Sequence, residues 1–292
     1  MLMAVVTGKR AAFAVAAVVA ATLGGCDTVG RTQATGPSVA VLEEDKTGTA
    51  KINIESLSDV IQRNPNDPSA YNTRGAAYAR AGRYPDAIAD FNKALQIDPN
   101  NAPAYTNRAL AYRQSGRNDG AAADFSKAIQ ADPNYAAAYI GRANLERVQG
   151  NYDSALSDLS QAIRLTPESA EALHARGLVY QRMGRHREAI IDFDAAIDRN
   201  SYVAAPYAAR GQSLIATTQY EKAIEDFNAA LNLNNKDGDA WANRGVAYEK
   251  SGRKKEAAES YQRALAAEPG NATAKQGLGR VQGGVASLLG RG

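Results

Sequence analysis

The chain repeats itself every 34 residues, and this period limits its fold more strongly than any other feature. Alanine occupies one position of all six repeats: Ala87, Ala121, Ala155, Ala189, Ala223 and Ala257. A second alanine column has the same spacing: Ala94, Ala128, Ala162, Ala196, Ala230 and Ala264. An aromatic residue or leucine recurs between the two: Phe91, Phe125, Leu159, Phe193, Phe227 and Tyr261. Since no insertion breaks the register from Pro68 to Asn271, the period indicates an array of units that pack on their neighbours.

Each repeat is predicted to form two antiparallel helices. In the first repeat we expect helices over 69–81 and 85–97, with Pro99 closing the unit. Glycine follows the first helix in five repeats, where a left-handed residue ends a helix well: Gly82, Gly116, Gly150, Gly184 and Gly252. The alanine columns allow helices to approach closely, and the aromatic column fills the space between units. Because one unit cannot bury its apolar face alone, stacking must supply the core.

This order of aromatic, small and proline positions at a period of 34 resembles the tetratricopeptide-repeat (TPR) family. The resemblance implies an all-α protein, a right-handed α-solenoid of six stacked helix pairs with a flanking helix at each end. The units would be 68–101, 102–135, 136–169, 170–203, 204–237 and 238–271. Residues 51–67 would form an N-terminal capping helix, and 272–292 a C-terminal capping helix and tail.

The C-terminal segment has two interpretations. Gly277 and Gly279 weaken its predicted helix over 272–282. The apolar residues Val281, Val285, Leu288 and Leu289 either fray or contact the groove or a second protomer, which would give a homodimer.

The N-terminus is predicted to be an export signal. Lys9 and Arg10 precede twelve largely apolar residues, which are too few to cross a bilayer as a helix. The sequence Leu23-Gly24-Gly25-Cys26 then resembles the bacterial lipobox, in which the cysteine is acylated and becomes the new N-terminus. We therefore expect residues 1–25 to be a signal peptide and 26–50 a lipidated flexible tether. An ordinary signal peptide that ends near a cysteine is the alternative.

The lipobox predicts a location. The protein would sit in the bacterial cell envelope, lipid-anchored and facing the periplasm. Asp27 resembles the inner-membrane retention signal of enteric bacteria and favours the inner membrane, but the choice between inner and outer membrane stays open.

Composition argues against several function classes. The formal net charge is +3, and removal of Lys9 and Arg10 leaves 32 basic and 31 acidic residues, so nucleic acid is not an expected partner. One cysteine and two histidines leave little for a metal site. No nucleophile motif or phosphate-binding loop is present, so we expect no enzyme activity and no cofactor.

Two charged columns run through the repeats. Arginine holds the seventh position of each unit and aspartate the twenty-third in five: Arg74, Arg108, Arg142, Arg176 and Arg210 with Asp90, Asp124, Asp158, Asp192 and Asp226. The family resemblance places these positions opposite each other, which favours structural ion pairs over a basic binding strip. In the last unit Ser260 replaces the aspartate opposite Arg244.

The resemblance also implies a concave groove lined by the first helix of each unit. Its predicted protein-binding residues are Asn72, Thr106, Leu110, Arg113, Ile140, Asn144, Arg147, His174, Leu178 and Gln181, with Arg182 nearby. No lysine occupies these positions, unlike the chaperone-tail clamp of some TPR proteins. The groove suits a peptide or helix with apolar anchors and some acidic residues. Arginines at the turns between paired helices predict a basic edge that is either a solvated rim or a contact with anionic lipid or peptidoglycan.

A lipid anchor joined to such an array is similar in design to the NlpI family of lipoproteins, which scaffold cell-wall hydrolases and deliver them to a periplasmic protease. We therefore expect a non-catalytic envelope adaptor that binds protein partners. The alternative is a pilotin-type or Tad-type lipoprotein for pilus or secretion assembly, which shares this layout.

Overall fold

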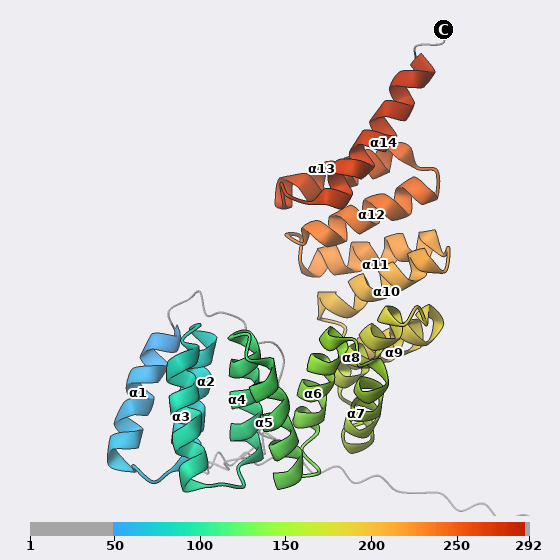
Figure 1. The fold of residues 1–292 in the computed structure, drawn as a ribbon. Coiled ribbons are helices and arrows are strands. Elements are labelled where there is room, and N and C mark those ends of the chain that lie inside the picture. The colour runs from blue at the N-terminus through green and yellow to red at the C-terminus, as the bar shows by residue number, and fades with distance from the viewer. Residues whose placement is uncertain (1–48, 290–292) are drawn as a thin grey trace, which may run out of the picture. The chain divides into compact units, whose positions relative to one another are not determined.

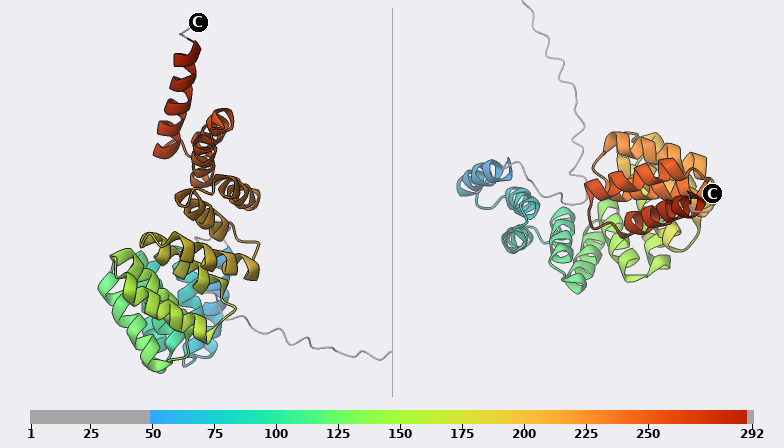
Figure 2. Two further views of the ribbon diagram at one scale, coloured as in Figure 1. Left: turned by 90° about the vertical axis from the view of Figure 1, so that its right-hand side faces the viewer. Right: turned by 90° about the horizontal axis from the view of Figure 1, so that it is seen from above.

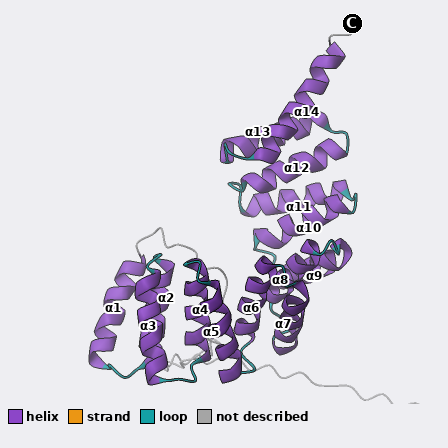
Figure 3. Ribbon diagram, viewed as in Figure 1, coloured by secondary structure: helices purple, strands orange, loops and turns teal. Residues whose placement is uncertain are grey.

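A computed structural model describes residues 49–289, and this part of the chain consists of helices and short connections without any strand (Figures 1 and 3). The first helices of the six units are α2 (Pro68–Arg80), α4 (Ala102–Gln114), α6 (Ala136–Gln149), α8 (Ala170–Arg182), α10 (Ala204–Ala216) and α12 (Gly238–Lys250). The second helices are α3 (Tyr84–Ile97), α5 (Asn118–Ala131), α7 (Tyr152–Leu165), α9 (His186–Arg199), α11 (Tyr220–Leu233) and α13 (Lys254–Ala267). The flanking helices are α1 (Thr49–Arg63) and α14 (Ala272–Leu289). We call the first set the A helices and the second the B helices.

Local sequence explains where these helices end. The glycines after five A helices have φ between +72° and +84°, and Thr218 takes this conformation in the fifth unit with φ 62°. The amide that follows such a glycine donates to a carbonyl five residues back, as from Arg83 to Tyr78 O at 2.9 Å. Several A helices start at a side-chain cap, for example Asn101, whose Oδ1 accepts from the Ala104 amide.

Neighbouring units meet mainly where the B helix of one unit packs on the A helix of the next, and successive A helices add a second contact. Cα atoms of successive A helices approach within 8 Å from α2 to α12, whereas no such approach joins successive B helices among the described residues. This difference places the A helices on the inner side of the stack. Figures 1 and 2 show the course of the helices along it. At the ends, α1 packs on α2 as a B helix would, and α14 packs on α12 and α13 as a further A helix would. The described residues thus form an all-α solenoid of stacked helix pairs.

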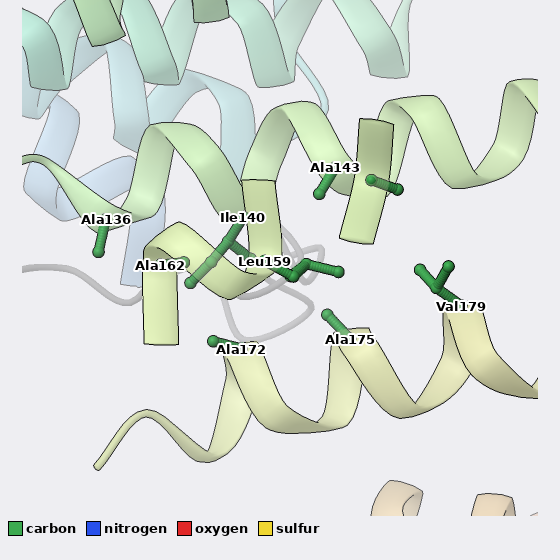
Figure 4. Packing of buried hydrophobic residues seen from close by; sticks show 9 residues of the cluster. Ala136, Ile140, Ala143, Leu159, Ala162, Ala172, Ala175 and Val179 are labelled. Atoms are coloured by element: carbon green, nitrogen blue, oxygen red, sulfur yellow. The ribbon is translucent and has the colours of Figure 1, made fainter. Parts of the chain in front are cut away.

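The core repeats with the sequence. The two alanine columns and the aromatic or leucine column are fully buried in every unit. Between the third and fourth units, Ile140 of α6 and Leu159 of α7 point toward each other, with Ala172 and Ala175 of α8 closing the space (Figure 4).

The flanking helices differ in extent from their predicted limits. α1 begins at Thr49, inside the predicted tether, and α14 continues past residue 282 to Leu289. Val281 is buried in one cluster with Tyr261. Gly277 packs against the Tyr261 ring so closely that a Cβ atom there would overlap it. The glycine that weakens α14 therefore also allows α14 to pack on α13. The side chains of Val285, Leu288 and Leu289 lie outside the described residues.

The predicted signal peptide, Cys26, Asp27 and most of the tether also lie outside the described residues. Within the described part, every helix is too short or too polar to span a bilayer.

Candidate functional site

The arginine and aspartate columns meet as bidentate ion pairs. The structure joins Arg74 to Asp90, Arg108 to Asp124, Arg142 to Asp158, Arg176 to Asp192 and Arg210 to Asp226. In each pair, Nε donates to Oδ2 and Nη2 to Oδ1 at 2.6–2.8 Å. All five aspartates are buried. Parallel two-bond contacts of this kind fix a guanidinium in one orientation.

These arginines also tie neighbouring units together. The Nη1 atom of Arg108 donates to Asn92 Oδ1, which belongs to the preceding B helix, at 2.6 Å. The same guanidinium lies 5.5 Å from the centroid of the Tyr105 ring. All five arginines bond a buried aspartate, and the Nη1 atoms of four of them also donate to the preceding B helix or to α1. The column therefore holds the stack together and does not offer a free binding strip.

The last unit departs from this pattern. Arg244 has no aspartate opposite it, and its Nε donates to Ser260 Oγ at 3.2 Å. Its Nη1 donates to Asn228 Oδ1 at 2.8 Å, and its guanidinium stacks 4.3 Å from the Trp241 ring centroid. Burial lowers the pKa of Arg244. An indole and two neutral acceptors therefore replace the carboxylate that every preceding unit supplies.

Three of the seven residues of the predicted basic edge (Arg83, Arg117, Arg185, Arg187, Arg253, Lys254 and Lys255) are paired within the chain. Arg83, Arg185 and Arg253 each bond an acidic residue three positions later, at 2.8–2.9 Å. The guanidinium groups of the same three residues lie 4.5–4.6 Å from a tyrosine ring centroid of the preceding A helix. These contacts occupy the arginines locally, so the turns favour the interpretation as a solvated rim.

The ten predicted groove residues fall into two groups. Seven are partly accessible on the A helices: Asn72, Arg113, Asn144, Arg147, His174, Leu178 and Gln181. Thr106, Leu110 and Ile140 are instead buried, with exposed fractions of 0%, 5% and 4%. Their prediction as partner contacts needs correction, because the close approach of successive A helices covers them. Ile140 points into the core beside Leu159 (Figure 4).

Two accessible groove amides are engaged within the array. The Asn72 Oδ1 atom accepts from Asn107 Nδ2 at 3.0 Å, across the first and second units. The Gln181 Nε2 atom donates to Ala209 O and to Ser213 Oγ, both at 3.0 Å, across the fourth and fifth. These amides bridge A helices, which leaves the charged and apolar groove residues for binding.

Three arginines converge on the inner face without a counterion. Arg113, Arg147 and Arg182 lie in the last turns of α4, α6 and α8. Burial lowers the pKa of Arg147, and the nearby charges of Arg182 and Arg113 lower it further. The described residues place no carboxylate in an ion pair with any of the three. We call these residues the arginine triad.

A small cavity continues the groove beyond the triad. It has a volume of about 310 Å³ and is lined from α8 and α10 by His174, Leu178, Ala205, Ala208, Ala209 and Gln212. Asp237 and Asp239 lie on its α12 side. Burial, together with the charge of Arg147, lowers the pKa of His174 to about 4, so this imidazole is neutral at pH 7. The cavity is therefore mainly apolar, with Asp237 and Asp239 on one side and Arg147 near enough for its charge to act on His174.

Ala208 and Gln212 of α10 stand at the fifth and ninth positions of their unit, which the repeat predicts to line the groove. The residues predicted from those positions did not include Ala205 and Ala209 beside them, or Asp237 and Asp239 on the α12 side. Among residues 49–289, no group of three or more histidine, cysteine or acidic side chains could hold a metal ion.

Comparison with known proteins agrees with this architecture. Tetratricopeptide-repeat models match residues 68–101, 102–135, 170–202 and 208–272, and a TPR repeat model matches 143–184. These ranges cover more than half of the chain. Among curated proteins, none is significantly similar in sequence.

Several solved structures share the fold. A chain of the APC/C hetero-tetramer Cut9–Hcn1 matches with a TM-score of 0.72 and 21% identity over 80% of this chain, which spans 46% of that one. PilF of Pseudomonas aeruginosa matches with a TM-score of 0.65 and 20% identity, covering 72% of this chain and 95% of PilF. PilW, a type IV pilus biogenesis factor, matches with a TM-score of 0.66 and 17% identity, covering 72% of this chain and 97% of PilW. At these identities the likeness shows the fold alone.

Proposed function

Because the chain belongs to the tetratricopeptide-repeat family, whose members are generally non-catalytic scaffolds, we propose that it is an adaptor that binds protein partners through its A helices. One observation carries this proposal: the arginine triad and the adjoining cavity are accessible on the inner face, whereas the arginines of the repeat column are bonded within the array. A cationic surface beside an apolar cavity can orient and hold a protein segment.

The proposed setting is the bacterial envelope. Support comes from the N-terminal sequence, where a short apolar segment ends in a lipobox-like motif at Cys26. The protein would be acylated there and would face the periplasm, with the repeats held away from the membrane by the tether. Partners would be envelope proteins, such as cell-wall enzymes or a periplasmic protease.

Assembly of a pilus or secretion system is the second candidate. The lipid-plus-repeat layout suits it, and two proteins of similar fold, PilF and PilW, carry pilus-related names. Genes for pilus components beside this gene would favour this role, and genes for cell-wall enzymes would favour the first.

Replacement of the lipidated residue tests the anchor. Cys26→Ala is expected to move the protein from the membrane fraction to the soluble periplasmic fraction, because acylation is the proposed attachment. Fractionation and labelling with an alkyne analogue of palmitate measure this change, and Cys26→Ser serves as a second variant that lacks the thiol. An unlabelled protein that stays with the membrane in both variants would contradict the lipoprotein assignment.

Site-specific crosslinking tests the binding face. A photoreactive amino acid at Leu178, in the groove, is expected to capture a partner in intact cells. The matched control places the photoreactive amino acid at position 191 instead, where Ile191 of α9 is 66% exposed. This variant is expected to capture little. Mass spectrometry of the captured bands identifies the partner. Capture from position 191 but none from position 178 would place the interface on the B helices and overturn the proposal.

A further inference from the structure

We propose that the groove recognises a protein segment in which acidic residues adjoin one large apolar side chain. The carboxylates would bind the arginine triad, and the apolar side chain would enter the cavity beside His174 and Leu178. This inference rests on the proposed adaptor function and specifies the chemistry of its partner.

The first step concerns charge. Arg113, Arg147 and Arg182 lie close enough for their charges to act on one another, yet no ion pair of the described residues involves them. Desolvation lowers the pKa of Arg113 and of Arg147, since burial disfavours a charge without a partner. A bound carboxylate would relieve both the mutual repulsion and the loss of hydration.

The second step concerns one atom. The Nε atom of Arg147 is buried and has no acceptor in the structure. A buried donor without a partner destabilises a protein, so such atoms are rare. The paired arginines of the repeat column show how Nε is otherwise satisfied, as Arg108 Nε donates to Asp124 at 2.6 Å. A carboxylate oxygen of a bound segment would supply the same acceptor to Arg147.

The third step concerns the cavity. Its volume of about 310 Å³ fits one or two side chains of a peptide rather than a folded element. His174 contributes a neutral imidazole whose ring centroid lies 5.7 Å from that of Phe193. An apolar side chain of the bound segment would be buried against Leu178 and the alanines of α10. Burial of such anchor side chains usually supplies most of the affinity of a protein interface.

The α12 side of the cavity indicates where the acidic and the apolar residues of the bound segment would lie. Asp237 caps α12 by accepting from the Ala240 amide at 2.8 Å, and Asp239 accepts from Asn271 Nδ2 at 2.8 Å. Their negative charge disfavours carboxylates beyond the cavity. Acidic residues of the segment would therefore lie over α4 to α8, and the apolar side chain over α8 and α10. Apolar walls beside the cations favour a peptide over an anionic lipid head group.

Selection from random peptides displayed on phage tests the proposal with the protein purified without its leader. The wild type is expected to enrich peptides with aspartate or glutamate next to leucine, isoleucine, methionine or phenylalanine. Arg113→Glu with Arg147→Glu is expected to lose the acidic preference and to bind a selected peptide at least about tenfold more weakly at low salt. Lys93→Glu with Lys222→Glu makes the same charge change at exposed residues of α3 and α11 and is expected to select as wild type does.

The cavity is tested separately. Ala208→Trp should fill it from the accessible side of α10, and is expected to remove the apolar preference while the acidic preference remains. Retention of both preferences by this variant and by the charge-reversal variant would overturn the proposal. So would wild-type enrichment of basic peptides, or binding to vesicles of anionic phospholipid that selected peptides do not displace.

The outcomes separate the two proposals. If position 178 captures a partner in cells but the phage selection shows no preference for acidic and apolar residues, the adaptor function stands and the inference is wrong. Capture confined to position 191, with no peptide bound at the triad, would remove both.

Discussion

Asp124→Ala is expected to destabilise the protein by ~3 kcal/mol. Asp124 and Arg108 form the most buried of the repeated pairs, with side-chain exposures of 4% and 14%. Removal of the carboxylate leaves the Arg108 guanidinium in its half-buried place with Asn92 Oδ1 as its remaining strong acceptor. The loss is large because an unpaired charge must then be kept away from water. Urea unfolding followed by circular dichroism measures it.

The exposed pair of Arg83 and Asp86 provides a matched control. Its side chains are 53% and 49% exposed, so Asp86→Ala is expected to change stability by less than ~1 kcal/mol. In a double-mutant cycle, Arg108→Ala and Asp124→Ala should together cost less than the sum of the single effects. Equal effects of Asp124→Ala and Asp86→Ala would show that the column contributes little to the stack and would return its arginines to the candidates for binding.

Gly141→Ala is expected to destabilise by about 1–3 kcal/mol, although alanine favours a helix over glycine. A Cβ atom at Gly141 would lie 2.3 Å from Cε1 and 2.7 Å from Cζ of Phe125. Phe125 is fully buried in the preceding unit, so its ring cannot move aside without disturbing the contact between the second and third units. Thermal unfolding is expected to begin at a lower temperature.

Gly279→Ala is the matched control for this change. Gly279 lies within α14, and a Cβ atom there would meet nothing within 4 Å. Alanine at this position is expected to leave stability unchanged or to raise it by up to ~1 kcal/mol. The two glycines should therefore respond with opposite signs. A stabilising Gly141→Ala would mean that the unit boundary adjusts easily, and the close approach of α6 to Phe125 would then have little energetic weight.

These two experiments separate repeated local chemistry from the packing between units. The Arg108–Asp124 pair is predicted by the two charged columns and by the family resemblance, which places these positions opposite each other. The importance of Gly141 does not follow from the sequence, since that position is threonine, asparagine or alanine in other units. Only the stack shows that the Phe125 ring lies against it.

The groove illustrates the same limit. The fifth position of a unit is Asn72, Thr106, Ile140 or His174 in the first four units, and the period predicts one environment for all of them. In the structure Asn72 and His174 are partly accessible, whereas Thr106 and Ile140 are buried. The difference arises because neighbouring A helices cover this position with side chains of unequal size.

The repeat pattern predicted the helix pairs, the glycine-ended A helices and the buried alanine and aromatic columns, and with the family resemblance it predicted the partners of the five ion pairs. All of these depend on contacts that recur with the 34-residue period. Three features could be read only from the folded stack: which groove residues stay accessible, that the described residues offer the arginine triad no ion-pair partner, and that α8 and α10 line an open hollow. Those features depend on side chains that differ from one unit to the next and meet only across unit boundaries, where the period carries no information.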